Sequence, residues 1–465
     1  MSPNLAQNQA KTWGQLEFGE AKLGDQRLTK RLTFIADIFA NHPTLSIPQA
    51  CDTWNITKAT YRFFDNDKIK DQDILTPHQE ATQKRLQSYS TVLAIQDTTQ
   101  LDFTHHPSTE GLGILSDPSH HGLFYHPTLL VTPNKVPLGI AHHQVWKRSL
   151  KTFGKKHTRK HRPISKKESQ KWLNSLDATA ELQEKNPSLH FVNVGDREAD
   201  IFDCFLRAQA LQVDVLVRVA WNRRIDAPEK YLWDHMAKVP VSGSITIRVP
   251  RKKGKPHREA ILSICYDRIS LKPPKYRSKE KTLTPQTVWV IWAHEPHPPK
   301  GIEPISWMLT TTIPVASFQE AIEKIHWYTC RWLIELFFKI LKSGCQIEQR
   351  QFETAERIQR CLALDAVVAW RVLYLTMLSR ATPQIPCDAL LEREEWQALY
   401  CFIHKTKKPP KTPPSLIEAT RMIAQLGGFL GRKSDGHPGP STIWLGLQRL
   451  RDITLGWSIG CSRSS

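Results

Sequence analysis

The sequence lacks the motifs and segments that mark several classes of protein. Its nine cysteines include no Cys-x-x-Cys pair, which argues against both a disulfide framework and a structural zinc site. No Gly-x4-Gly-Lys-Ser/Thr loop is present, so ATP is not an expected partner. No apolar run reaches the roughly 18 residues that cross a bilayer, and residues 1–13 do not have the pattern of a secretory signal. We therefore expect a soluble protein of the cytoplasm or nucleoid that spans no membrane.

Acidic residues are scarce relative to basic ones. The 465 residues include 64 Lys and Arg against 45 Asp and Glu, which gives a formal net charge of +19. A charge balance of this sign favours a polyanionic partner, and nucleic acid is the first candidate. Apolar residues make up 40% of the chain and charged residues 23%, as in globular proteins. The length predicts about two to four folding units.

The hydrophobic pattern changes along the chain. Helical spacing of apolar residues dominates the beginning and the end, whereas short apolar runs bounded by turn residues begin at Val92 and are typical of an α/β core. A β-rich insertion is expected at about 240–313, followed by one long helix at 318–341. The predicted division is a helical domain at 1–70, an α/β domain at 71–380 and a helical C-terminal region at 381–465.

Two predicted buried strands each end in an aspartate. The apolar run Val92–Ile95 leads into Asp97, and the run Phe191–Val194 leads into Asp196. Asp97 is chosen over the nearby Asp102 because only Asp97 closes an apolar strand. Two carboxylates at the ends of buried strands are candidates for a shared site.

Other polar residues near these strands are given different roles. Glu198 and Asp200 follow Asp196 so closely that we expect them to begin the next helix, where carboxylates suit the helix dipole, and not to bind a metal. The strongly basic segment Lys147–Lys171 is either a mobile loop or a loop that contacts DNA.

The predicted helix at 318–341 aligns one acid with several cations. With about 100° between successive residues, one narrow stripe holds five polar side chains, namely Tyr328, Arg331, Glu335, Lys339 and Lys342. The neighbouring faces are apolar and include Trp332, so most of the helix surface is expected to be buried. Ion pairs within the helix, such as Arg331 with Glu335, would explain the stripe in purely structural terms.

The acids on the two strands and on the helix together fit metal-dependent phosphodiester chemistry. Such chemistry needs an activated nucleophile and a stabilised leaving oxygen, and two Mg²⁺ ions held by a few carboxylates supply both. Magnesium prefers oxygen ligands and keeps several waters, so carboxylates from separate elements suffice. Asp97, Asp196 and Glu335 are therefore the predicted catalytic and metal-binding residues, with Mg²⁺ as cofactor and Mn²⁺ as a possible substitute.

The spacing Tyr328-x2-Arg331-x3-Glu335-x6-Lys342 is the YREK signature of the insertion-sequence-4 type of DDE transposases, and the sequence closely resembles the transposon-five group of that family. Similar segments extend over nearly the whole chain, at Leu23–Arg27, Tyr61–Phe63, Ala94–Thr99, Lys167–Ser169, Gly195–Asp200 and Leu426–Phe429. The resemblance implies an RNase H-like catalytic core with a β-rich insertion. It also implies a helical N-terminal domain that binds DNA ends and a C-terminal dimerisation region.

The resemblance also assigns roles to individual residues. It implies that Asp97, Asp196 and Glu335 are the metal ligands. Trp307 matches the family's tryptophan that stacks on a base flipped out as a DNA hairpin forms, although a core tryptophan is the alternative. The DNA contacts that it implies are Tyr328, Arg331, Lys339, Lys342, Arg218, Arg27, Lys30, Arg31 and Arg62.

The implied activity is cut-and-paste DNA transposition. A homodimer in the DNA-bound complex would bind the inverted ends of its own element, nick one strand, form and open a hairpin, and join the 3′ ends to target DNA. Two alternatives are a DNA-binding inhibitor of transposition without catalytic activity and a metal-dependent nuclease with the same core. Intact carboxylates at all three positions argue against the inhibitor, because a protein that only binds DNA has no use for them.

Overall fold

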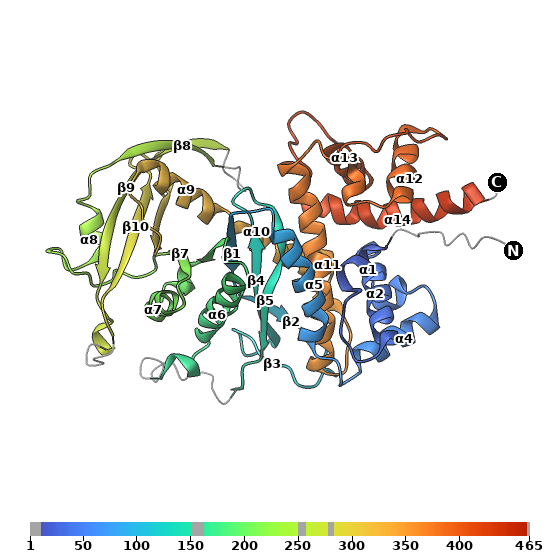
Figure 1. The fold of residues 1–465 in the computed structure, drawn as a ribbon, viewed down its shortest axis with the longest axis horizontal. Coiled ribbons are helices and arrows are strands. Elements are labelled where there is room, and N and C mark those ends of the chain that lie inside the picture. Colours follow the sequence, from blue (N-terminus) through green and yellow to red (C-terminus); the bar gives the residue numbers. More distant parts are fainter. Residues whose placement is uncertain (1–10, 151–161, 250–256, 278–282, 463–465) are drawn as a thin grey trace.

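A computed structural model describes residues 11–150, 162–249, 257–277 and 283–462 (Figure 1). Within these residues one mixed sheet runs through the molecule, with the strand order β2-β4-β1-β6-β7-β11-β10-β9-β8 and with β3 and β5 also paired to β4. The strands are β1 (Thr91–Gln96), β2 (Thr99–Asp102), β3 (Gly113–Ile114), β4 (His121–Val131), β5 (Pro137–Trp146), β6 (His190–Gly195), β7 (Asp214–Arg218), β8 (Gly243–Val249), β9 (Arg258–Leu271), β10 (Gln286–His294) and β11 (Ser306–Thr311).

Three adjacent strands, β1, β6 and β7, are parallel and almost wholly buried. The register pairs Ile95 with Val194 and Gly195 with Val217, so the carboxyl ends of the three strands meet at one edge of the sheet. Parallel strands covered on both faces have nearly continuous apolar sequences, which is why these strands could be predicted. We call this edge, where Asp97 and Asp196 follow β1 and β6, the catalytic edge.

Helices cover both faces of the central strands. Helices α6 (Gln170–Lys185) and α7 (Phe202–Leu211) pack in a smaller core with Val215 and Val217 of β7, while Leu216 points into the larger core on the other face. Successive side chains along a strand point to opposite faces of the sheet, so neighbouring residues of β7 enter different cores. Helices α5 (Asp71–Leu86) and α11 (Ala355–Ala381) pack against β5 within the larger core. Helix α11 is long and apolar enough to span a membrane, but 89% of its most apolar window is buried inside the protein.

The N-terminal helices pack against the core through buried arginines. They are α1 (Trp13–Phe18), α2 (Gln26–Asn41), α3 (Ile47–Ala50) and α4 (Trp54–Phe64). Arg350 forms a buried ion pair with Asp365 of α11 at 3.0 Å and donates a 2.8 Å hydrogen bond to the carbonyl of Leu45. Arg360 of α11 likewise donates to the carbonyl of Phe64 at 2.8 Å. These contacts fix the N-terminal helices on α11, as Figure 1 shows.

The C-terminal region consists of α12 (Arg393–His404), α13 (Leu416–Leu426) and α14 (Pro440–Ser462). Figure 1 shows these helices beside the N-terminal helices and far from the β-rich end of the molecule. Thr44 donates a 2.6 Å hydrogen bond to Gln448, which joins the two terminal regions. The predicted helical character of both regions is confirmed.

The β-rich insertion extends the central sheet. The expected strands correspond to β8, β9, β10 and β11, and β11 pairs antiparallel with β7, with Leu309 opposite Arg218. The short helix α8 (Leu232–Met236) lies before β8. The prediction of an insertion of strands is thus confirmed, and the pairing with β7 places its last strand next to the catalytic edge (Figure 1).

The prediction of one long helix at 318–341 is wrong. The segment forms α9 (Phe318–Thr329), α10 (Trp332–Lys339) and a π-helical turn at Ile340–Gly344. Around Cys330 and Arg331 the backbone bonds span three residues, as in the 3.0 Å bond from Ile334 N–H to the Arg331 carbonyl. Neither proline nor glycine marks this change, so the helical periodicity concealed it. Such short departures from α-helical geometry are common at functional sites.

Candidate active site

Asp97 and Asp196 lie side by side at the catalytic edge. Each directly follows one of two paired parallel strands, and backbone N–H groups hold both carboxylates. Thr98 donates to Asp97 Oδ1 at 2.7 Å, and Glu198 donates to Asp196 Oδ1 at 2.8 Å. The other oxygen of Asp97, Oδ2, accepts a hydrogen bond from Arg331.

Arg331 connects the helix acid to the first strand-end acid. Its Nη1 lies 3.2 Å from Asp97 Oδ2, and its Nη2 lies 2.7 Å from Glu335 Oε1. Its buried Nε has no hydrogen-bond partner in the part of the chain that the structure describes. The tight turn before α10 places this guanidinium between the sheet and the helix. The ion pair between Arg331 and Glu335 anticipated from their spacing is therefore present, and it extends to Asp97.

The charges of Asp196 and Glu335 both act on Asp97. The pKa of Asp97 is raised to about 6, chiefly by burial and also by the charges of Asp196 and Glu335, against the opposing effects of the Thr98 N–H group and of Arg331. Burial also raises the pKa of Asp196, as does the nearby Glu198. Carboxylates that repel one another in a partly buried site are stabilised in their charged forms by a bound cation.

These acids have the donor chemistry that Mg²⁺ requires. All three offer carboxylate oxygens, and two of them are destabilised as anions by their surroundings. Among the described residues, no three His, Cys, Asp or Glu side chains are grouped closely enough to hold a metal directly. Arg331 lies between Asp97 and Glu335 and pairs with both. Asp97, Asp196 and Glu335 would hold the ion once that guanidinium moved aside.

Tyr328 and Arg218 both interact electrostatically with Arg331. Burial raises the pKa of the Tyr328 phenol, while the charges of Arg331 and Arg218 counteract that rise. Burial lowers the pKa of Arg218, and the nearby charges of Arg197 and Arg331 lower it further. Several guanidinium groups therefore face the catalytic edge. Trp307 of β11 is half-buried and packs against the larger core, two residues from Leu309, which pairs with Arg218.

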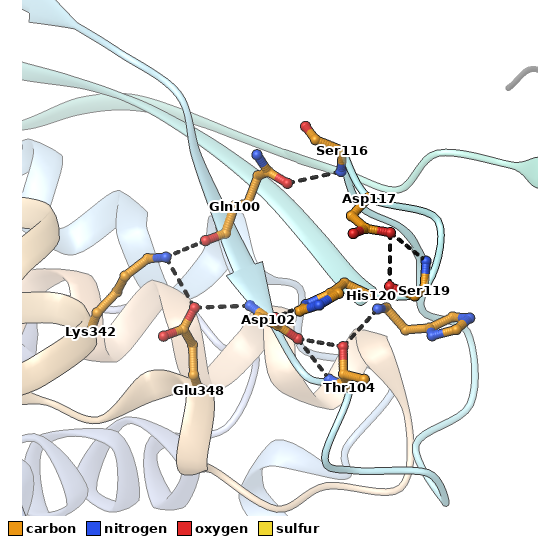
Figure 2. Close-up of polar contacts among 10 residues, drawn as sticks. Gln100, Asp102, Thr104, Ser116, Asp117, Ser119, His120, Lys342 and Glu348 are labelled. Carbon is orange, nitrogen blue, oxygen red and sulfur yellow. Dashed lines mark hydrogen bonds and ion pairs between the residues drawn. The ribbon is translucent and has the colours of Figure 1, made fainter. Parts of the chain in front are cut away.

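Lys342 pairs with an acid other than the three candidates, and a π-helical turn interrupts the α-helical spacing from which the single stripe was predicted. It forms a 3.0 Å ion pair with Glu348 and donates to the carbonyl of Gln100, as Figure 2 shows. The π-helical turn changes the angle between successive side chains, which the assumed 100° spacing could not include. Lys339 is exposed on α10. Trp332, expected on a buried face, is 60% exposed.

Asp102 belongs to a separate network of hydrogen bonds (Figure 2). Its Oδ2 lies 2.6 Å from His120 Nδ1, and Thr104 donates to its Oδ1 from the backbone at 2.9 Å. Burial tends to raise the pKa of Asp102, but the hydrogen bonds from Thr104 and His120 outweigh it and hold the pKa at about 2. The Asp102 carboxylate therefore forms its hydrogen bonds with residues outside the candidate active site.

Two groups that support the site were not found from the sequence. His126 of β4 shares a 2.9 Å hydrogen bond with Thr98, the residue after Asp97, and burial keeps its pKa well below the usual value. Lys171 of α6 is nearly buried, lies 3.1 Å from Glu198, and its charge lowers the pKa of Asp196. Lone buried histidines and lysines carry no sequence signal, because only the fold brings them near Asp97 and Asp196.

The predicted N-terminal DNA contacts lie on helices α2 and α4. Arg27 is 90% exposed and pairs with Asp25, and Lys30 and Arg62 are also exposed, whereas Arg31 is half-buried. None of them lies in the cluster at the catalytic edge. Most of the basic residues predicted in the loop after Lys147, at positions 151–161, lie outside the described residues.

Asp200 has neither of the roles considered for it. It follows the 3₁₀ turn Arg197–Ala199, and helix α7 begins only at Phe202. Its carboxylate is 1% exposed and pairs with Arg223 at 2.6 Å. The expectation that Asp200 begins the next helix is therefore wrong. Its charge is paired instead with Arg223, which lies beyond the next strand in the sequence.

The mixed sheet with helices on both faces fits an RNase H-like fold. Comparison with protein families refines this class. Residues 10–69 match a transposase DNA-binding family, residues 141–370 match a transposase DDE domain, and residues 367–464 match the transposase Tn5 dimerisation domain. The chain is a DNA transposase of the Tn5-like kind that binds DNA and carries a dimerisation domain.

Proposed function

We propose that this transposase moves its own element by a cut-and-paste reaction that uses Asp97, Asp196 and Glu335 as ligands of two Mg²⁺ ions. The observation that carries the proposal is the grouping of these acids around Arg331, which contacts Asp97 at 3.2 Å and Glu335 at 2.7 Å. Bound metal would activate the attacking oxygen and stabilise the leaving one. One such site can serve nicking, hairpin formation, hairpin opening and strand transfer, because each is an in-line displacement at phosphorus.

The cations around the acids would bind the scissile strand. The insertion-sequence-4 signature residues Tyr328, Arg331 and Lys342, together with Arg218, would contact its phosphates. Trp307 would stack on a flipped base beside the hairpin. The Nη groups of Arg331 that pair with Asp97 and Glu335 would turn to a phosphate oxygen when metal holds these acids. The N-terminal helices would bind the inverted ends, and the C-terminal region would join two copies on DNA in the bacterial cytoplasm.

A product assay tests the proposal. The full chain is incubated with Mg²⁺, a plasmid target and labelled duplexes taken from the DNA that flanks its gene. Hairpin and joined products are expected. Cleavage without joining would indicate a nuclease, and a bound but uncut duplex would indicate a DNA-binding inhibitor. Cleavage retained in Glu335→Ala would contradict the assignment of the site.

A further inference from the structure

Three exposed aromatic side chains lie on one short segment after β7. Trp221, Tyr231 and Trp233 are 66%, 44% and 48% exposed. An isolated bridge pairs Arg224 with Tyr231, and the backbone N–H of Trp233 donates to the side chain of Asn222 at 2.9 Å. These contacts fold residues 220–233 back on themselves, and we call the segment the aromatic hairpin.

The base of the aromatic hairpin is fixed by the buried carboxylate of Asp200. This carboxylate accepts hydrogen bonds from the backbone N–H groups of Ala220 at 2.8 Å and Trp221 at 3.3 Å. It also accepts from Nε of Arg223 at 2.8 Å. Both charged side chains are largely buried, at 1% and 13% exposure, and breaking such a pair is costly. The position of Trp221 is therefore set by the fold, although its ring is exposed.

The aromatic hairpin starts at the catalytic edge. Strand β7 lies parallel to β6, and Gly195 pairs with Val217, so the chain leaves β7 beside Asp196. The anchoring Asp200 belongs to the connection that follows Asp196. Arg197 is exposed on that same connection, and its charge acts on Arg218 at the end of β7. Cationic groups thus lie at the end of the strand from which the aromatic hairpin starts.

The charges of the aromatic hairpin also suit DNA. Of its acids, Asp226 pairs with Lys272 at 2.8 Å and Glu229 pairs with Lys238 at 3.2 Å, so their charges are compensated. A tryptophan as exposed as Trp221 leaves a large apolar face in water, which is typical of a binding surface. Aromatic rings beside arginines form a stacking surface for bases whose faces are free.

We propose that the aromatic hairpin stacks on unpaired bases of the DNA strand at the catalytic edge, with Trp221 as its main contact. This inference rests on the proposed function, because it assumes that DNA passes the three acids. Bases become unpaired wherever a strand is nicked or folded into a hairpin, so the surface would hold such a strand beside the reacting phosphate. Stacking does not depend on sequence, since every base offers a π face.

The test measures binding without metal, so that no cleavage occurs. A single-stranded oligonucleotide of mixed sequence that contains 2-aminopurine is titrated with the full chain, and a blunt duplex of the same sequence is titrated in parallel. In Trp221→Ala, affinity for the single strand should fall about tenfold and the quenching of 2-aminopurine should be lost. Affinity for the duplex should change less than about twofold, because its binding rests on phosphate contacts.

Two variants serve as controls. Trp221→Phe keeps an aromatic face and should retain most of the quenching. Tyr276→Ala removes an aromatic side chain that is 55% exposed on the turn Lys275–Arg277, outside the aromatic hairpin, and should bind like the unaltered chain. Unchanged single-strand affinity in Trp221→Ala would overturn the proposal. If Trp221→Ala instead self-associates more weakly in sedimentation, with its DNA affinity unchanged, the proposal would also be overturned. The aromatic hairpin would then bind a second copy of the chain.

The binding test can be interpreted whether or not the chain carries out the proposed reaction. Glu335→Ala should still quench 2-aminopurine in the single strand, because this variant leaves the rings of the aromatic hairpin unaltered. A chain that stacks on bases but gives no hairpin or joined products would contradict the proposed function alone.

Discussion

Nη1 of Arg331 lies 3.2 Å from Oδ2 of Asp97, although the two residues are 234 positions apart in the sequence. The same guanidinium pairs with Glu335 at 2.7 Å. It therefore neutralises part of the charge that would otherwise attract a metal ion. We therefore expect the binding of metal and the release of this arginine toward a DNA phosphate to be coupled.

Removing the guanidinium should strengthen metal binding in the absence of DNA. In Arg331→Gln two carboxylates lose their cationic partner, so the affinity for Mn²⁺ should rise about tenfold, which is the effect expected of one close charge. Isothermal titration calorimetry of the DNA-free protein measures this change. Lys339→Gln is the matched control, since Lys339 is an exposed cation on the same helix. Equal affinities in the two variants would contradict the coupling.

Metal binding should depend on pH through Asp97. Its pKa of about 6 means that the carboxylate is protonated at lower pH and cannot bind a cation. The rise in Tm on addition of Mg²⁺ should therefore be small at about pH 5 and increase as the pH passes about 6. Thermal denaturation with Mg²⁺ and with EDTA measures it, and Asp97→Asn should abolish the trend.

The metal-free protein should show the opposite trend. The pKa of Asp97 is raised from 3.8 to about 6 in the folded state, so the native protein binds an extra proton between these values. The stability that this proton provides is fully present below the unfolded pKa and is lost as the pH rises through the folded one. In EDTA, the stability difference between Asp97→Asn and the unaltered chain should thus shift in favour of the variant as the pH rises. A difference that is independent of pH would contradict the assigned pKa.

The ion pair between Lys342 and Glu348 should weaken DNA binding by Lys342. Glu348→Gln keeps an acceptor for the backbone N–H of Asp102, which donates to Glu348 at 2.9 Å, but removes the charge that holds the lysine. DNA affinity should rise about two- to fivefold, as expected for release of a partly exposed ion pair. Fluorescence anisotropy at several salt concentrations measures this. If Glu348→Gln has the same effect in a Lys342→Gln background, the lysine is not the cause.

Trp307 should matter for hairpin formation and little for the first nick. Loss of its indole removes a surface for a flipped base, and stacking of one base is worth about 1 to 3 kcal/mol. Trp307→Ala should therefore give nicked DNA with about tenfold less hairpin. Denaturing gels of an end-labelled duplex resolve both products. Trp307→Phe should restore part of the hairpin, whereas an equal loss of both products would point to a structural role.

The buried pair of Arg350 and Asp365 should contribute strongly to stability. Asp365→Ala leaves a buried guanidinium without its partner at 3.0 Å, and breaking such a pair costs about 3 to 5 kcal/mol. The free energy of unfolding should fall by about that amount in urea denaturation. Because Arg350 also donates to the carbonyl of Leu45, faster proteolysis between the N-terminal helices and the core should accompany it. Replacing both residues by apolar ones should recover part of the stability.

The sequence by itself determined the strands, the insertion and the candidate acids at the strand ends. Buried parallel strands must be apolar on both faces, so the runs before Asp97 and Asp196 were recognisable without any structure. The alternating strands of the insertion were equally visible. Glu335 could be selected because helical spacing placed it among cations. Spacing within one helix depends on the local sequence and not on the rest of the fold.

Only the tertiary structure decided which charges meet. No proline or glycine marks the helix break at Cys330, and helical periodicity does not reveal the π-helical turn at Ile340–Gly344, so the pairing of Lys342 with Glu348 could not be foreseen. The link from Arg331 to Asp97 and the use of Asp200 to hold Trp221 join residues that are distant in sequence. Periodicity reports which face of one element is buried, whereas pairing between elements depends on how the whole chain packs.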